Sequence, residues 1–181
     1  STPPPPLGRF DDAELSALAW ATGGPQRVLQ LWWVSLLKEG QLHQAPTADH
    51  GWDFEVHPID SQKADPWVRR ASAALAPGRY TRAQISNAWE PLLQQLRHEL
   101  VDRGLIFVRS SSFRSPVTPS GQDWRQKRVL KATAATRAPQ ASTLGLAVAA
   151  GGLAVLASTP FSALAGHVQP VPSSNSSSGG C

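Results

Sequence analysis

The sequence predicts a mainly α-helical fold with short β-hairpins, built from tandem winged-helix-like units. Apolar residues recur three and four positions apart over long stretches, which is typical of helices that bury one face. Two of these stretches end in the same way, at a glycine followed by an apolar segment, in residues 36–42 and 100–106. Between them, polar and apolar residues alternate in two short runs, which predicts a hairpin.

The first unit is predicted over residues 10–60. An acidic pair near its start favours the N-terminus of a helix, which Gly23-Gly24-Pro25 interrupts. A second helix extends from Pro25 to Glu39, and Gly40 suits the left-handed backbone that ends many helices. Residues 41–44 and 52–56 are then expected to pair as the strands of the hairpin.

The second unit is predicted over residues 61–110. A short helix comes first, and Thr81 can cap a longer helical stretch in which Pro91 starts or kinks a helix. Gly104 ends this stretch, and the apolar residues 105–108 predict a buried strand.

The composition of the remaining segments separates them from this folded part. A proline-rich leader (residues 1–9) and a Ser/Gly tail (residues 167–181) are predicted to be disordered, because neither has the apolar residues that a core needs. Residues 111–143 are predicted to form a basic, serine-rich linker.

Residues 144–166 are predicted to form a marginal transmembrane helix. This run has 23 residues without a charged side chain, and about 20 predominantly apolar residues cross a bilayer. The alternative is a buried helix or an Ala/Gly-rich linker, because alanine and glycine make the run only mildly hydrophobic. No Lys or Arg follows the run, so residues 1–140 are predicted to be cytoplasmic, with the tail on the opposite side of the membrane. The basic residues expected near lipid headgroups are Arg125, Lys127, Arg128, Lys131 and Arg137.

The distribution of charge argues against a nucleic acid as the partner. Residues 1–110 carry 11 Lys and Arg against 12 Asp and Glu, and residues 111–181 carry 6 against one. The excess of positive charge therefore belongs to the segment after the predicted domain. Because a nucleic-acid-binding domain carries its basic residues on the fold itself, we expect this domain to contact other proteins instead.

Three histidines are weak candidates for a metal site. His43, His50 and His57 recur at every seventh position across the predicted hairpin, and pairing of its strands would bring His43 and His57 close together. Their spacing matches no established zinc pattern. We therefore predict no bound metal and no cofactor.

The sequence contains no motif that indicates an enzyme. It lacks the phosphate-binding loop, the dinucleotide fingerprint and the Gly-x-Ser-x-Gly elbow. Its single cysteine, Cys181, leaves no partner for an intrachain disulfide. No pattern points to a small-molecule ligand, so a non-enzymatic role is predicted.

Several motifs together resemble an uncharacterised family of bacterial membrane proteins. The pattern Ala-x-x-x-Gly-Gly-Pro-x-Arg runs from Ala19 to Arg27 and contains Gly23, Gly24 and Pro25. A Leu-x-x-x-Gly-x-Leu helix end follows at Gly40. Residues 57–60 and 96–106, which include Gly104, then come in the order found in the family. The resemblance covers about residues 12–110 and the last ten residues, which look like the start of a Gly/Cys-rich tail. It implies a membrane protein and brings no established activity with it.

These observations predict a non-enzymatic, membrane-anchored protein whose cytoplasmic helical domain contacts other proteins. The alternative is a membrane-tethered winged-helix regulator that binds DNA. An enzyme of unrecognised class is the third interpretation.

Overall fold

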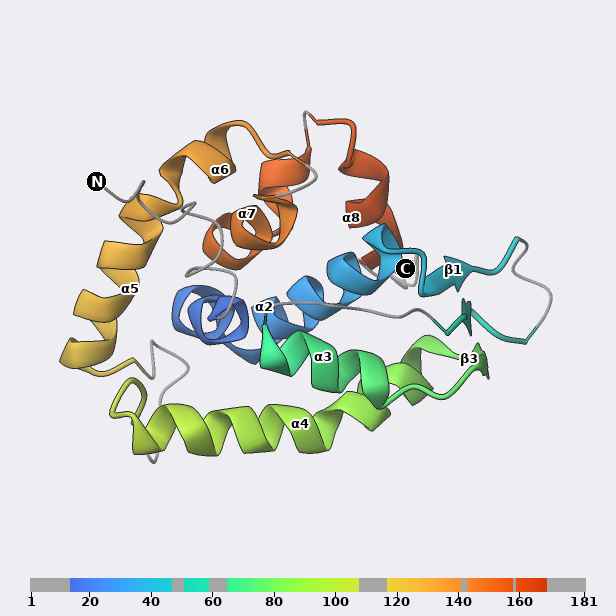
Figure 1. Cartoon of the computed structure of the whole chain (residues 1–181), viewed down its shortest axis with the longest axis horizontal. Coiled ribbons are helices and arrows are strands. Elements are labelled where there is room, and N and C mark those ends of the chain that lie inside the picture. Colours follow the sequence, from blue (N-terminus) through green and yellow to red (C-terminus); the bar gives the residue numbers. More distant parts are fainter. Residues whose placement is uncertain are drawn as a thin grey trace, which may run out of the picture.

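The computed structural model describes residues 14–46, 51–58, 65–107, 117–140, 143–157 and 159–168. These residues form a mainly helical body in which one long helix lies at the centre and the other helices surround it (Figure 1). The predicted disordered leader and tail lie outside the described residues, apart from the last two residues of a C-terminal helix.

The elements follow one another along the chain with short connections. They are α2 (Leu15–Lys38), β1 (Leu42–Gln44), β2 (Phe54–Val56), α3 (Pro66–Ala73), β3 (Gly78–Tyr80), α4 (Arg82–Asp102), α5 (Pro119–Lys131), α6 (Thr133–Arg137), α7 (Leu144–Gly151), η3 (Leu153–Leu156) and α8 (Ser162–Val168).

The central helix α2 consists of two helical parts joined at a kink. Gly24 leaves the helical conformation, with φ 75° and ψ −168°, and Pro25 follows it. Almost only glycine adopts this region of backbone conformation, and proline has no N–H to donate to the preceding turn. The predicted interruption at this point is therefore confirmed.

The sheet joins the two halves of the sequence that we predicted as separate units. β1 and β2 pair antiparallel, with Leu42 opposite Val56, which confirms the predicted hairpin. β2 also pairs antiparallel with β3, with Phe54 opposite Tyr80, so the strand order is β1-β2-β3. No strand was predicted at β3, and the winged-helix arrangement is not confirmed.

Aromatic side chains from three elements meet in the core beside this sheet. The rings of Trp32 and Trp33 in α2 contact that of Trp89 in α4, with centroid distances of 5.7 and 5.2 Å. Trp33 also contacts Phe54 of β2 at 4.9 Å. These rings carry much apolar area, and their contacts tie α2, α4 and the sheet into one core.

The uncharged run 144–166 does not form the predicted single helix. Gly152, with φ 76°, ends α7 after eight residues, and η3 and α8 follow as separate short helices. Within the described ranges, no helix is both long enough and apolar enough to cross a bilayer.

The apolar residues of α7 are buried against the protein instead. Leu144, Ala147 and Val148 are fully buried in the core, and α7 lies along α2 (Figure 1). Thr22 of α2 also donates a hydrogen bond to the carbonyl oxygen of Ala149, at 2.6 Å. The alternative of a buried helix explains why this part of the run lacks charge.

The structure also corrects two smaller predictions. Most of the described part of the predicted linker 111–143 is helical and forms α5 and α6. Thr118 caps α5 by accepting a hydrogen bond from the N–H of Gly121 at 2.9 Å. In the predicted strand 105–108, Ile106 makes an isolated bridge with Val117, and Val108 lies outside the described residues.

Candidate binding groove

A groove of about 410 Å³ lies between the first half of α2 and the middle of α4. Its apolar side chains come from both helices and from the segment after α4. They are Trp20, Pro25, Leu29, Leu93, Ile106 and Phe107. Polar side chains of Gln26, Glu90, Gln94 and Arg97 line it as well. An apolar surface bordered by a few polar groups is the usual form of a binding site.

Local backbone features place both sides of this groove. On α2, the kink at Gly24 directly precedes Pro25, which lines the groove. On the other side, Gly104 adopts φ 73° and its N–H donates to the carbonyl of Val101 at 2.9 Å, which ends α4 and turns the chain back. Ile106 and Phe107 are thereby brought beside α4.

Phe107 is an apolar side chain that the fold leaves open to solvent. It is 49% exposed, and Leu130 on α5, at 67%, is the other large apolar side chain so exposed among the residues that the structure describes. Of these two, only Phe107 lines the groove. A large ring held at the edge of an apolar groove favours contact with another molecule.

Trp20 lines the same groove and has an unusual indole nitrogen. Its side chain is 7% exposed, and its Nε1 has no hydrogen-bond partner within the described part of the chain. Other buried tryptophans do have partners: Trp32 donates to Oγ of Ser16 at 3.0 Å, and Trp89 donates to the carbonyl of Ala71 at 2.9 Å. Because buried donors are almost always satisfied, an indole N–H without a partner among the described residues is uncommon at this depth.

The histidines are only partly brought together. The ring centroids of His43 in β1 and of His57, which directly follows β2, lie 4.5 Å apart. Nε2 of His57 is 3.3 Å from Oε1 of Glu55. His50 lies outside the described residues. Within the described part of the chain, no three His, Cys, Asp or Glu side chains are arranged to hold a metal ion.

The Gly-Gly-Pro-x-Arg motif has a structural role at the end of α7. Nη1 of Arg27 is 3.4 Å from the carbonyl oxygen of Ala150, and its guanidinium lies against Gly152. A cation is favourable at the C-terminus of a helix, where carbonyl groups lack partners. Partial burial lowers the pKa of Arg27 from its ordinary value without threatening its charge. Gly40 adopts φ 78°, as predicted for the end of a helix.

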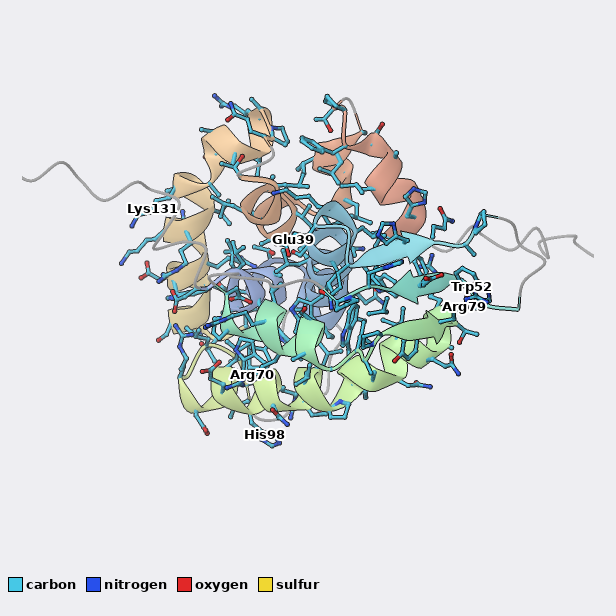
Figure 2. The ribbon with its side chains drawn as sticks, turned by 45° about the vertical axis from the view of Figure 1, so that its right-hand side comes forward. Glu39, Trp52, Arg70, Arg79, His98 and Lys131 are labelled. Carbon is cyan, nitrogen blue, oxygen red and sulfur yellow. The ribbon has the colours of Figure 1, made fainter. Side chains whose placement is uncertain are left out.

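The five basic residues predicted near lipid headgroups divide into two groups. Arg125 donates to the carbonyl of Ala21 at 3.2 Å, and Arg128 pairs with Glu14 at 2.5 Å while it stacks on Trp124. These two hold α5 against α2. The others are more exposed: Lys127 pairs with Asp123 at 3.0 Å, Lys131 points away from the body of the protein (Figure 2), and Arg137 is exposed.

Sequence reasoning missed a buried carboxyl group that joins α2 to α3. Asp65 is 2% exposed and accepts hydrogen bonds from Oγ of Ser16 at 2.6 Å and from the N–H of Val68 at 3.0 Å. Burial raises its pKa to about 6, although these hydrogen bonds act in the opposite direction. Its place before Pro66 signals a helix cap in the sequence, but the contact with Ser16 depends on the fold.

Comparison with known proteins does not assign this chain to a family. No protein-family model matches it, and neither the curated proteins nor the solved structures include a significant match. The groove between α2 and α4 is therefore interpreted from its own geometry.

Proposed function

We propose that this protein is a non-enzymatic binding domain whose groove between α2 and α4 takes an apolar segment of a partner protein. The observation that carries the proposal is the half-exposed Phe107 beside an apolar surface formed by Leu29 and Leu93. Aromatic side chains in such positions often supply most of the binding energy at an interface.

The polar side chains around this surface also suit a peptide ligand. Nε2 of Gln94 donates to Oε1 of Glu90 at 3.1 Å along the exposed face of α4. Amide and carboxylate groups at the edge of an apolar surface can bind the backbone of a ligand and orient it. The groove thus combines apolar and polar lining side chains.

Peptide selection against the full chain tests this proposal. A display library of 12-residue peptides without proline is selected on the 181-residue protein, and the dissociation constants of the selected peptides are measured by calorimetry. Phe107→Ala is expected to weaken binding about tenfold or more, because truncation of an aromatic residue that anchors an interface costs about 2 kcal/mol or more.

Leu130→Ala is the matched control, because Leu130 is also exposed but lies on α5, away from the groove. It is expected to leave the dissociation constants unchanged. Equal affinities for wild type and Phe107→Ala would remove the basis for the proposal.

Residence at a membrane, with residues 1–140 cytoplasmic, stays a prediction from the sequence. The exposed Lys127, Lys131 and Arg137 remain the basic residues that favour contact with anionic headgroups. Separation of membrane and soluble fractions from cells that express the full chain tests this prediction.

A further inference from the structure

Helices α5 and α6 expose basic and apolar side chains together on one side. Five exposed residues recur at the spacing of a single helix face, and we call them the outer face: Lys127, Leu130, Lys131, Ala134 and Arg137. On the opposite side, Ala132 and Ala135 are buried in the core. Both helices lie at the edge of the molecule (Figure 1), and Lys131 points away from its body (Figure 2).

The outer face carries positive charge and no carboxylate of its own. Residues 124–140 contain five Lys and Arg and no Asp or Glu. Two of the five, Arg125 and Arg128, bind Ala21 and Glu14 in the fold. The other three cations remain on the outer face.

The acidic residue nearest in sequence to the outer face, Asp123, does little to offset this charge. Its carboxylate pairs with Lys127 at 3.0 Å, but the two side chains are 66% and 70% exposed. An ion pair in such an exposed position is weak, because water and salt screen it. Lys127 can therefore exchange this partner for another anion.

Leu130 decides between the anionic surfaces that three cations can bind. It is 67% exposed, so it contributes little to the core, and Lys127 and Lys131 lie on either side of it. The phosphates of a nucleic acid attract cations, but they offer no apolar layer to a leucine. At a bilayer surface, lysines contact anionic headgroups while an apolar side chain enters the boundary of the acyl chains.

We propose that the outer face of α5 and α6 binds the surface of a bilayer that contains anionic lipids, with Leu130 inserted between the headgroups. This contact goes beyond the groove between α2 and α4, because it uses other helices and another kind of partner. It also makes the predicted residence at a membrane more specific, since it needs no membrane-spanning helix.

Co-sedimentation of the full chain with vesicles tests the proposal. Binding is expected to vesicles of phosphatidylcholine with about one third phosphatidylserine, to be far weaker to phosphatidylcholine alone, and to be lost in about 1 M NaCl. Lys131→Gln with Arg137→Gln is expected to weaken binding about tenfold or more, because each cation at such a surface contributes about fivefold. Leu130→Ala is expected to weaken it about threefold or more.

Two control variants separate this surface from net charge and from the groove. Arg69→Gln with Arg79→Gln removes the same charge from exposed positions on α3 and β3, so vesicle binding is expected to change by less than about twofold. Phe107→Ala, which alters the groove, is also expected to leave vesicle binding unchanged. Leu130→Ala thus affects vesicles and not peptides, and Phe107→Ala affects peptides and not vesicles.

Three results would overturn the inference. Equal binding to neutral and anionic vesicles, or none to either, shows that the outer face does not bind anionic lipid. Binding that persists in about 1 M NaCl and in both outer-face variants belongs to another segment. Binding that duplex DNA competes away, and that Leu130→Ala leaves unchanged, identifies a nucleic-acid contact instead. If cell fractionation nevertheless places the chain in membranes, the predicted residence holds and only the named surface is wrong.

Discussion

At the scale of single residues, Asp65 shows how one side chain couples packing to protonation. Its carboxyl group caps α3 and binds Ser16 of α2, whose hydroxyl in turn accepts the indole N–H of Trp32. The hydrogen bonds favour the charged carboxylate, but burial disfavours it more strongly and raises the pKa to about 6. The same contact that joins two helices therefore makes the stability of the fold depend on pH.

Asp65 is expected to make the fold less stable as pH rises from about 4 to about 6. The folded state holds the proton more tightly than the unfolded state, in which the pKa is near 3.8. Stability from this group is thus complete below pH 4 and is lost as pH rises through the folded pKa, by about 3 kcal/mol in total.

Urea denaturation at pH 4, 5, 6 and 7 measures this effect as the difference between wild type and Asp65→Asn. Asparagine keeps one oxygen to accept from Ser16 and Val68 but has no charge to bury. We expect the difference in the free energy of unfolding to change by about 3 kcal/mol across this range. Parallel pH profiles for the two proteins would contradict the role assigned to Asp65.

At the scale of elements, backbone conformation at two glycines divides the helices. Gly24 kinks α2 and Gly152 ends α7, and both combine a φ near 75° with an extended ψ. Because this combination is almost exclusive to glycine, each break is encoded locally. The break in α7 divides a run whose length alone predicted one membrane-spanning helix.

Gly24→Ala is expected to lower the free energy of unfolding by about 1–3 kcal/mol. A Cβ at this position meets no other atom within 4 Å, so the loss comes from backbone strain alone. Thermal and urea denaturation measure it. Gly166→Ala is the control, since Gly166 lies in α8 with equally open surroundings, and helix propensity predicts that alanine stabilises it slightly.

At the scale of the whole molecule, the C-terminal helices complete the core of the N-terminal ones. Val28 and Leu31 of α2 belong to the same buried cluster as Leu144 and Val148 of α7. At the C-terminal end of α8, the carbonyl oxygen of Val168 accepts a hydrogen bond from Arg82, at the start of α4, at 2.8 Å. Residues far apart in the sequence thus support each other across α2.

Ala147→Asp is expected to lower the free energy of unfolding by more than about 3 kcal/mol, because it places a charge in the fully buried contact between α7 and α2. Ala163→Asp is the control: Ala163 is exposed near the start of α8, so a change within about 0.5 kcal/mol is expected. Circular dichroism with urea denaturation distinguishes the two. Equal stability of both variants would show that α7 is not part of the core.

The parts of the fold that depend on neighbouring residues were predictable from the sequence. The interruption at Gly24, the hairpin from residue 41 to 56 and the cap at Thr81 all follow from local spacing and backbone preference. By contrast, Gly78–Tyr80 is too short to show alternation, so its pairing with β2 had no local signal. Histidines 43 and 57 were expected to lie close if the strands paired, and they do.

The sequence by itself determined the interruption of α2 at Gly24, its end before Gly40 and the start of α4 after Thr81, because glycine, proline and capping residues act on the backbone at their own positions. Only the tertiary structure decided what each apolar surface contacts. The hydrophobicity of a side chain indicates that it is removed from water, but not whether lipid or protein surrounds it instead. Residues 144–166 were therefore compatible with a transmembrane helix and with a helix buried in the protein. The groove had no signal in the sequence for the same reason. Trp20, Leu93 and Phe107 come from three separate segments, and they form one surface only after α2 and α4 have packed together.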